Sequence, residues 1–494
     1  MKTFQPAWNA SRHLARLWST LEDGRIQCHL SPRNCIMKEG QPGFCRVRQN
    51  IGGRLVTLNY GRATQLTCES IETEAVFHYA PGARILSLGN IGCMMACDYC
   101  HNWKTSQAKF VSDKDVKIYT PGQVVDFAES QGIKILSWTY NDPVVWHEFV
   151  LDTAHLARQR GLRNLFKSAF YISVEAASEL CDVIDIFSIS IKTMDPDFYR
   201  KIAKGQLEPV LEATRYVHGR GKHLEISNLM VTDANDRVED ARAMASWVLN
   251  ELSDTVPLHF VRFHPDYKYT HVPRTPVERL TRAREAAKEM GVRHCYLGNV
   301  YDHEGTNTKC RSCGTLLIER YGLNTRIKGL DGDGRCRNCG TSAEIAAFDW
   351  SEPPEEHVHA PLRARDEARS ASFTWSNDIN ACHVAADNSA AHDCRLYYYR
   401  LLEDGREDGP YARSFRAKGE GRFILSKSAP DETGVRLAYG NGLDVRLFRV
   451  FDRAHYPTVD VALETAENPA IPQPMYRPGL TRSAPYEAGA DTEL

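Results

Sequence analysis

The stretch from Arg84 to Trp103 reads RILSLGNIGCMMACDYCHNW, and it joins a strand signal to three closely spaced cysteines. Residues 84–88 form a short, largely apolar run, which predicts a buried strand. The loop that follows carries Cys93, Cys97 and Cys100 in the spacing CxxxCxxC. Three thiolates on one loop can wrap a [4Fe–4S] cluster, whose protein ligands are ordinarily four cysteines, so that one iron stays open. A chance spacing and a zinc loop with a further ligand from elsewhere are the plain alternatives.

Strand and helix signals alternate from this stretch onward, up to about Val300. Apolar, β-rich runs predict strands at residues 84–88, 133–140, 164–170, 183–191, 223–231 and 258–263. Helical periodicity predicts helices at residues 121–131, 144–160, 174–180, 207–219, 238–252 and 276–290. Such alternation implies a parallel sheet with crossover helices. We therefore expect an α/β fold, a partial (β/α)6 TIM-like barrel, with its chemistry at the carboxyl ends of the strands.

The rest of the chain predicts smaller parts around this core. We expect an N-terminal cysteine-containing lobe at 1–83, the barrel at 84–303, a metal-binding module at 304–349, a charged linker at 350–372, a β-rich accessory domain at 373–454 and a disordered tail at 455–494. In the accessory domain, Gly440-Asn441-Gly442 predicts a hairpin between 435–439 and 443–451. Tyr397, Tyr398 and Tyr399 predict a strand that packs this domain, with a peptide- or sugar-binding face as the alternative.

Composition excludes several classes of protein. The 494 residues hold 61 basic and 63 acidic side chains, so there is no excess charge that would favour nucleic acid or an anionic membrane. No apolar run reaches the ~18 residues of a membrane helix, and the first 17 residues lack the features of a signal peptide. Clustered cysteines, 15 in total, indicate metal ligands in a reducing compartment, and we expect a cytoplasmic protein.

At the cysteine loop the chain resembles the radical SAM superfamily, and within it the radical SAM member of the AmmeMemoRadiSam systems, a relative of pyruvate formate-lyase activating enzymes. The resemblance covers roughly residues 7–345 and rests on the stretches 79–82, 86–89, 92–107, 139–143, 207–211, 259–267 and 298–300. It implies an oxidoreductase-like enzyme that binds S-adenosylmethionine (SAM) at a [4Fe–4S] cluster, cleaves it to a 5′-deoxyadenosyl radical and takes hydrogen from a small-molecule or peptide substrate. It further implies a low-potential donor, flavodoxin or ferredoxin, and partners of the Memo or Amme type.

Two other functions stay open. An activase would install a glycyl radical on a partner protein, and a non-catalytic scaffold would bind metal without cleaving SAM. Retention of all three loop cysteines argues against the scaffold.

The resemblance also implies which residues bind SAM. Tyr99 matches the aromatic residue near the adenine, Asn141 and Asp142 match a Tyr-Asn-Glu-Pro segment near the methionine amine, Lys192 matches a lysine near the carboxylate, and His264 could line the adenine. Lys192 as a solvated strand-end lysine and His264 as a core histidine are the ordinary alternatives.

This sequence departs from the family pattern at two strand ends. Ser190-Ile191-Lys192 stands where the family has Asp-Leu-Lys, and Ser168-Ala169-Phe170 stands where it has Thr-Asn-Gly. The large Phe170 in place of glycine predicts an altered substrate pocket.

Nine of the remaining cysteines form three sets. Cys310-x-x-Cys313 and Cys336-x-x-Cys339 are each followed by glycine, which is typical of a zinc ribbon, with an auxiliary iron–sulfur cluster as the alternative. In the N-terminal lobe, Cys28, Cys35 and Cys45 could bind metal, with Ser31 where the family has a fourth cysteine and His29 as a possible substitute, or they could be plain buried thiols. The late pair Cys382 and Cys394, with neighbouring histidines, matches no firm metal pattern.

Overall fold

The computed structural model describes residues 4–300, 303–346, 369–375, 381–388, 394–415, 420–427, 431–439, 443–451 and 458–459. The chain divides into two compact units, Met1–Ser351 and Glu352–Leu494. Nearly all of the predicted tail, 455–494, and most of the predicted linker lie outside the described residues.

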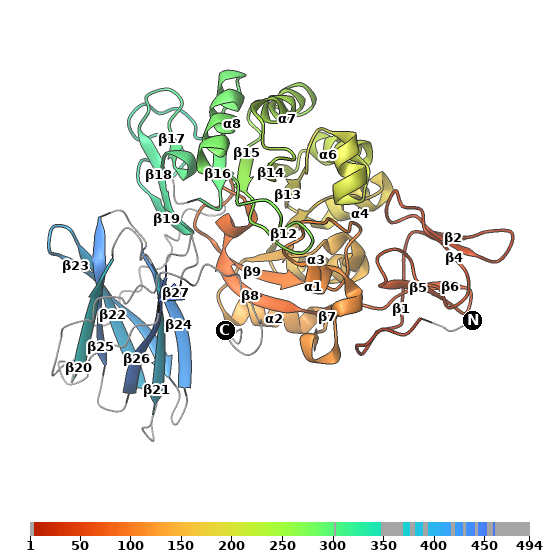
Figure 1. Ribbon diagram of the computed structural model, residues 1–494, viewed down its shortest axis with the longest axis horizontal. Coiled ribbons are helices and arrows are strands. Elements are labelled where there is room, and N and C mark those ends of the chain that lie inside the picture. The colour runs from red at the N-terminus through yellow and green to blue at the C-terminus, as the bar shows by residue number, and fades with distance from the viewer. Residues whose placement is uncertain are drawn as a thin grey trace. The chain divides into compact units, whose positions relative to one another are not determined.

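An eight-stranded sheet forms the centre of the first unit (Figure 1). Its strands, in spatial order, are β16 (Cys295–Gly298), β15 (Leu258–Arg262), β14 (His223–Met230), β13 (Ile186–Ser190), β12 (Arg163–Ser168), β11 (Ile135–Thr139), β9 (Arg84–Gly89) and β8 (Gln65–Ser70). From β9 to β16 the neighbours pair in parallel, and β8 runs antiparallel to β9. The six predicted strands are present, which confirms an α/β fold, and the four-residue β16 is an additional parallel strand that was too short to predict.

Crossover helices cover one face of this sheet (Figure 1). They are α2 (Pro121–Ser130), α3 (His147–Gln159), α4 (Val174–Val183), α6 (Leu207–Gly219), α7 (Val238–Glu251) and α8 (Val277–Glu289). The Thr-Pro pairs at 120–121 and 275–276 both predict a threonine cap with proline in the first helical turn. Thr120 does cap α2, with Pro121 in its first turn. At α8 the prediction is wrong by one residue, because Pro276 itself is the cap, with φ −56° and ψ 137°.

The two faces of the sheet differ in chemistry because side chains alternate along each strand. Leu86, Trp138 and Phe166 belong to the apolar core. The opposite face, here called the polar face, carries Ser87, Ser137, Lys167, Ser188, Glu225 and His259, which lie on one side by the register of the strands. The buried carboxylate of Glu74 accepts hydrogen bonds from Ser87 (3.3 Å), Ser137 (3.0 Å) and Thr139 (2.7 Å), so the polar face is part of the folded interior.

Small antiparallel sheets flank the central one. Near the N-terminus, β1 (His13–Leu14), β6 (Arg54–Thr57) and β5 (Arg48–Ile51) form one sheet, and β2 (Trp18–Thr20), β3 (Ile26–Cys28) and β4 (Ile36–Met37) form another. A buried ion pair between Arg48 and Glu148 ties this lobe to α3. The two CxxC pairs lie beside a sheet of β17 (Thr308–Lys309), β18 (Leu316–Tyr321) and β19 (Asn324–Ile327).

The second unit contains two four-stranded antiparallel sheets. One has the order β20 (Arg369–Thr374), β25 (Glu432–Tyr439), β22 (Cys394–Leu402), β23 (Glu407–Phe415), and the other β24 (Glu420–Ser426), β21 (Ala381–Asn388), β26 (Leu443–Phe451), β27 (Thr458–Val459). The predicted hairpin is wrong, because β25 and β26 lie in different sheets. Tyr397 and Tyr399 are buried in a cluster with Ala438, so they pack the domain. The side chains of Cys382 and Cys394 lie outside the described residues.

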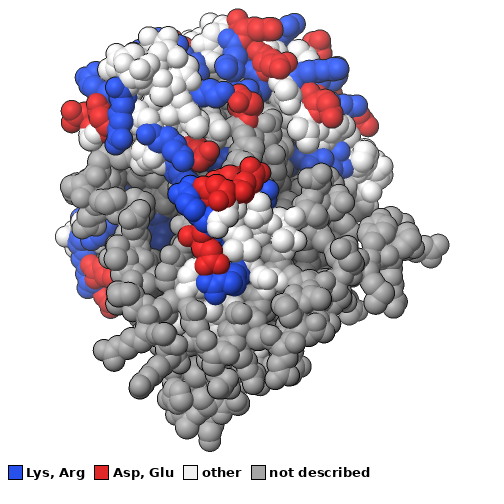
Figure 2. Space-filling view, turned by 90° about the vertical axis from the view of Figure 1, so that its left-hand side faces the viewer, with Lys and Arg blue, Asp and Glu red and all other residues white. Residues whose placement is uncertain are grey.

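The described surface seen in Figure 2 shows no large patch of one charge. On the face seen in Figure 2, the described Lys and Arg residues are interspersed with Asp and Glu. Among the helices of the described ranges, none has the length and apolarity needed to cross a membrane.

Candidate functional site

The three cysteines of the loop after β9 lie at the carboxyl end of that strand, and all three are half-buried. The backbone N–H of Met95 donates to Sγ of Cys93 at 3.3 Å, and Sγ of Cys100 lies 3.3 Å from the hydroxyl of Ser106. The Cys97 thiol donates to the carbonyl of Ala203 at 3.6 Å. Burial raises the pKa of Cys97 to about 11, and the positive charge of Lys192 opposes that shift.

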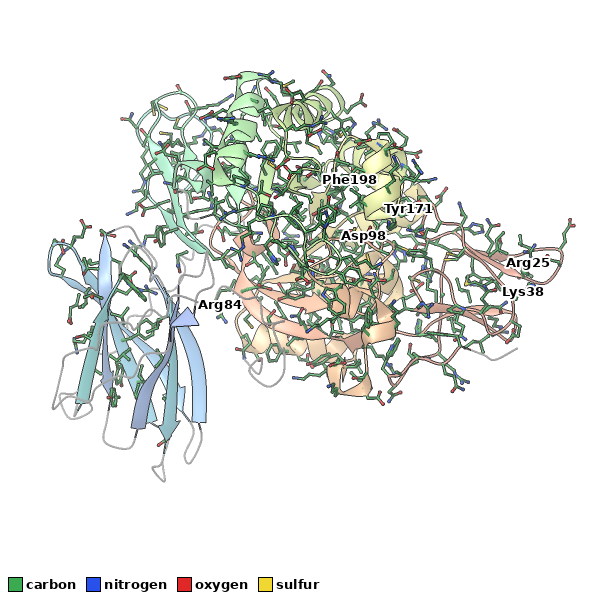
Figure 3. All side chains as sticks on the ribbon, in the orientation of Figure 1. Arg25, Lys38, Arg84, Asp98, Tyr171 and Phe198 are labelled. Atoms are coloured by element: carbon green, nitrogen blue, oxygen red, sulfur yellow. The ribbon has the colours of Figure 1, made fainter. Side chains whose placement is uncertain are left out.

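The loop is anchored from both sides. The Asp98 backbone N–H donates to the carbonyl of Ile202 at 3.0 Å, and its carboxylate pairs with Lys204 at 3.0 Å and Lys268 at 3.7 Å. Figure 3 labels the side chain of Asp98 in the first unit. Gly92 adopts a left-handed backbone, φ +90°, and a Cβ there would lie 3.0 Å from the carbonyl oxygen of Cys45. The loop is thus held both by residues that follow β13 and β15 and by the segment around Cys45.

Lys192 and Asp142 fit a polar ligand beside these thiols. Lys192 follows β13, and its charge acts on Cys97, Cys100 and Asp142. Its backbone is fixed by the hydroxyl of Tyr199, which accepts from its N–H at 3.0 Å. The Oδ2 atom of Asp142 is buried without a hydrogen-bond partner, and burial raises the pKa of this carboxyl to about 6. A buried carboxylate oxygen without a donor is open to a ligand that brings one.

Asn141 and Tyr99 also lie at this end of the sheet. Oδ1 of Asn141 accepts from Thr105, which follows the cysteine loop, at 2.8 Å. Tyr99 is buried, and its ring packs against Phe198 at 5.9 Å between ring centres. Both side chains therefore border the loop, and their roles toward SAM stay predictions.

His264 contacts His101, the residue that follows the third cysteine of the loop. The two imidazole rings stack at 3.6 Å between centres, and the ring Nε2 of His101 lies 2.9 Å from the carbonyl of His264. Burial and the neighbouring ring lower the pKa of His101 to about 4, so it is neutral at pH 7. The structure brings His264 to the loop, half-buried, at the end of β15.

The structure removes the argument that Phe170 alters the substrate pocket. Phe170 is fully buried and packs edge-on against Phe187 (5.8 Å) and Phe166 (6.3 Å), which face the helices and not the polar face. Its backbone is left-handed, φ +56°, a conformation that glycine adopts at less cost. This backbone conformation would favour glycine, the residue that the resemblance gives for this position. The neighbouring Ser168 donates to Asp142 at 2.7 Å and positions that carboxylate.

Sequence reasoning missed Lys167. This half-buried lysine lies on the polar face and donates to the hydroxyls of Ser188 (3.0 Å) and Ser227 (2.9 Å). Burial lowers its pKa to about 8, opposed by the nearby Glu74. A charged residue between Phe166 and Ser168 in an otherwise apolar strand was the available signal, because a lysine inside a strand needs a polar surface or a partner.

Comparison with known proteins agrees with this geometry. A family model described as the radical SAM superfamily matches residues 90–248, which include the three loop cysteines. The chain belongs to the radical SAM superfamily. It is 41% identical over 333 residues to an uncharacterized protein, MJ0808, of Methanocaldococcus jannaschii, a match that covers 67% of this chain and 98% of that protein.

More distant radical SAM relatives have named activities. The pyruvate formate-lyase-activating enzyme of Streptococcus mutans is 25% identical over 182 residues, covering 34% of this chain and 66% of the relative. Among solved structures, a domain of the pyruvate-formate lyase-activating enzyme from Bacteroides vulgatus matches with 14% identity and a TM-score of 0.30, covering 33% of this chain and 97% of that one.

Outside the radical SAM domain match, four cysteines converge at a second site. The ligand atoms of Cys310, Cys313, Cys336 and Cys339 lie within 4.8 Å of one another, and Cys310–Cys339 and Cys313–Cys336 have sulfur separations of 3.5 and 3.6 Å. Each CxxC turn repeats one pattern, in which the N–H of the following glycine, Gly314 or Gly340, donates to the carbonyl of the first cysteine at 2.9 or 2.8 Å. This geometry suggests metal binding.

Proposed function

We propose that this chain is a radical SAM enzyme that binds a [4Fe–4S] cluster through Cys93, Cys97 and Cys100 at the mouth of a partial (β/α) barrel. When bound, the cluster supplies the electron that cleaves SAM to methionine and a 5′-deoxyadenosyl radical, which abstracts hydrogen from the substrate. The observation that carries the proposal is the placement of three half-buried thiols on one loop, at the carboxyl edge of a parallel sheet, beside a lysine and a carboxylate.

The surrounding residues would bind and orient SAM. Lys192 offers a cation to the methionine carboxylate, and Asp142 offers its unpartnered oxygen to the methionine amine. Asn141, Tyr99 and His264 complete the wall of the site as the resemblance implies. His101 beside His264 is neutral at pH 7, so it would add no positive charge to the cationic SAM when that molecule is bound.

The substrate is a small molecule or a peptide in this proposal. Lys192 offers it one positive charge, whereas Glu74 and Glu225 offset the charge of Lys167 on the polar face. Similarity to pyruvate formate-lyase-activating enzymes supports the alternative, in which the chain installs a glycyl radical on a partner protein. Flavodoxin or ferredoxin would be the electron donor, and Memo- or Amme-type proteins would be partners.

The test of the proposal is anaerobic incubation of the reconstituted protein with SAM and dithionite. We expect 5′-deoxyadenosine by chromatography and an EPR signal of a reduced cubane cluster that changes when SAM is added. Absence of both in a protein with full iron and sulfide would contradict the proposal.

We expect Lys192→Met to weaken SAM binding by about 10- to 100-fold, because a hydrogen bond between charged groups contributes roughly 1.5–3 kcal/mol. The cluster should be retained, since Lys192 supplies no ligand. SAM affinity measured by the EPR change checks the prediction. Lys201→Met, at an exposed position of the same segment, should leave affinity unchanged.

For the four-cysteine group we propose a structural zinc ion. Tetrahedral Zn–S bonds of ~2.3 Å place neighbouring sulfurs roughly 3.8 Å apart, close to the observed separations. The hydroxyl of Thr315 lies 3.1 Å from Sγ of Cys313 and, as a hydrogen-bond donor, lowers the pKa of that thiol to about 5, which favours the thiolate.

Cys336→Ser should therefore release about one equivalent of zinc and lower the melting temperature while the loop cluster keeps its iron. Elemental analysis and calorimetry check this result. Loss of iron and sulfide in place of zinc would show an auxiliary cluster.

A further inference from the structure

An open cavity lies on the outer side of the loop that carries the three cluster cysteines. Its volume is about 610 Å³. Among the described residues of its wall, Cys93 is the only cluster cysteine, and neither Asp142 nor Lys192 of the proposed SAM site lines it. The charge of Asp142 acts on the thiol of Cys93, so this thiol is close to the SAM side. The loop therefore separates the two spaces, and we call this one the outer cavity.

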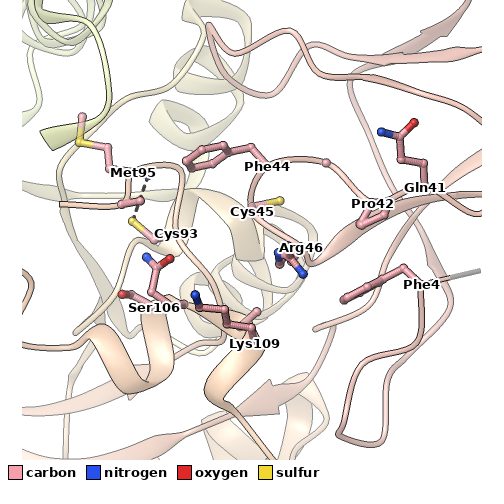
Figure 4. Close-up of a pocket in the computed structure, with 14 residues that line it drawn as sticks. Phe4, Gln41, Pro42, Phe44, Cys45, Arg46, Cys93, Met95, Ser106 and Lys109 are labelled. Atoms are coloured by element: carbon pink, nitrogen blue, oxygen red, sulfur yellow. Dashed lines mark hydrogen bonds between the residues drawn. The ribbon is translucent and has the colours of Figure 1, made fainter. Parts of the chain in front are cut away.

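The two sides of the outer cavity come from different parts of the chain. The N-terminal lobe contributes the segment 41–46, and the segment 106–109, which follows the cysteine loop, contributes the other side. Figure 4 shows Phe44 and Arg46 on the lobe segment and Lys109 on the other. Phe44 is 43% exposed although it is aromatic. Aromatic and arginine side chains are enriched at protein–protein interfaces, so this wall has the composition of an interface.

The charged side chains of this wall are positive. They are Arg46 and Lys109, both exposed, and no Asp or Glu is among the described residues that line the cavity. The Nζ atom of Lys109 lies 4.7 Å from the centre of the Phe110 ring, and the Arg46 guanidinium lies 5.8 Å from that of Phe4. Aromatic rings do not neutralise a cation, so the positive charge of the wall is available to an acidic partner.

The position of the outer cavity indicates what such a partner would do. The proposed chemistry needs one electron at the cluster while SAM and the substrate occupy the other side of the loop, closed to water. A donor on the outer side leaves that closed site undisturbed. Cys93 links the two sides, because it lines the outer cavity and its thiol is proposed to bind the cluster.

We propose that the outer cavity is the docking site of a small acidic redox protein, which reduces the cluster across the Cys93 end of the loop. The docking role rests on the proposed function and adds to it the surface and the charge of the partner. In this step the donor loses one electron and the cluster gains it, and no bond forms or breaks. Arg46 and Lys109 would attract and align the acidic surface, an effect that weakens as salt is added.

The test compares two sources of electrons: reduced flavodoxin, a small acidic protein, and dithionite, which needs no docking surface. We expect the double variant Arg46→Glu/Lys109→Glu to lower flavodoxin-driven formation of 5′-deoxyadenosine by about 10-fold or more at low salt. The dithionite-driven rate should stay at the wild-type level, because neither residue belongs to the proposed SAM site. The matched control is Lys134→Glu/Arg282→Glu, which changes the net charge equally at exposed positions before β11 and on α8. It should match wild type with both reductants.

Direct binding separates this test from the radical chemistry. Calorimetry with oxidised flavodoxin should detect binding to the wild type that the double variant loses, whether or not SAM is cleaved. Equal flavodoxin-driven rates in wild type and double variant would overturn the proposal, as would wild-type turnover with dithionite but none with flavodoxin. An equal loss with both reductants would contradict it too, since the substitutions would then act on the cluster. Absence of nucleoside from the wild type with dithionite would instead contradict the proposed function.

Discussion

Replacing Cys97 with alanine is expected to reduce 5′-deoxyadenosine formation to the level of a protein-free control. The loop offers three thiols, and a [4Fe–4S] cluster held by only two of them lacks most of its protein ligation. Iron content should fall by about four equivalents if the cluster is lost completely. Chromatography of the nucleoside products and iron analysis after anaerobic reconstitution measure both effects.

The control for that loss is Cys181→Ala on α4. Cys181 is buried in the same hydrophobic core but lies far along the chain from the loop, so its removal tests the general effect of deleting a buried thiol. It should retain iron and activity. Nucleoside formation by Cys97→Ala at the wild-type rate would exclude this loop as the reactive centre.

The second large effect concerns Glu225 on the polar face. Its carboxylate accepts from the backbone N–H groups of Phe77 (3.0 Å) and His78 (2.7 Å) and lies 2.7 Å from Nε2 of His259. Glu225→Ala should lower the free energy of unfolding by about 3–5 kcal/mol, because these buried donors lose their acceptor. Urea unfolding followed by circular dichroism checks the loss, and Glu212→Ala at an exposed position of α6 should change little.

The same carboxylate determines the direction in which the stability of the protein changes with pH. Hydrogen bonds from His223 and His259 outweigh the opposing effect of burial and hold the pKa of Glu225 well below its usual value. A depressed carboxyl pKa contributes stability that is fully present above the unfolded-state pKa, near 4.3, and is lost as the pH falls toward the folded value. Glu225→Gln should therefore flatten the loss of stability below about pH 4.3. If Glu225→Gln and wild type lose stability equally as the pH falls, groups other than Glu225 cause that loss.

Sequence patterns predicted the architecture of the first unit well because its strands are buried on both faces. Apolar runs separated by amphipathic helices identified six strands in order, and the cysteine spacing identified the loop after the first. The polar face was not predicted, because residues such as Lys167 and Glu225 meet only when parallel strands are placed in register. In the sequence, polar residues that alternate with apolar ones in a strand predict a face exposed to solvent, and the pattern does not distinguish it from a buried polar face.

The errors have equally physical causes. Phe170 was interpreted by its volume, whereas its left-handed backbone turns the ring toward Phe166 and Phe187. The hairpin in the second unit was inferred from turn residues alone, but turn chemistry does not determine which strands pair once two sheets are available.

The contacts of Glu148 and Glu74 predict how a truncated fragment of this protein would behave. The family-model match, residues 90–248, contains Glu148 but not Arg48, and it contains Ser137 and Thr139 of β11 but not Glu74, which accepts their hydrogen bonds. A fragment cut at those limits would have a charged side chain buried without its counter-ion and an uncapped sheet interior. The residues before position 90 therefore supply the counter-ion and the hydrogen-bond acceptor that the matched segment lacks.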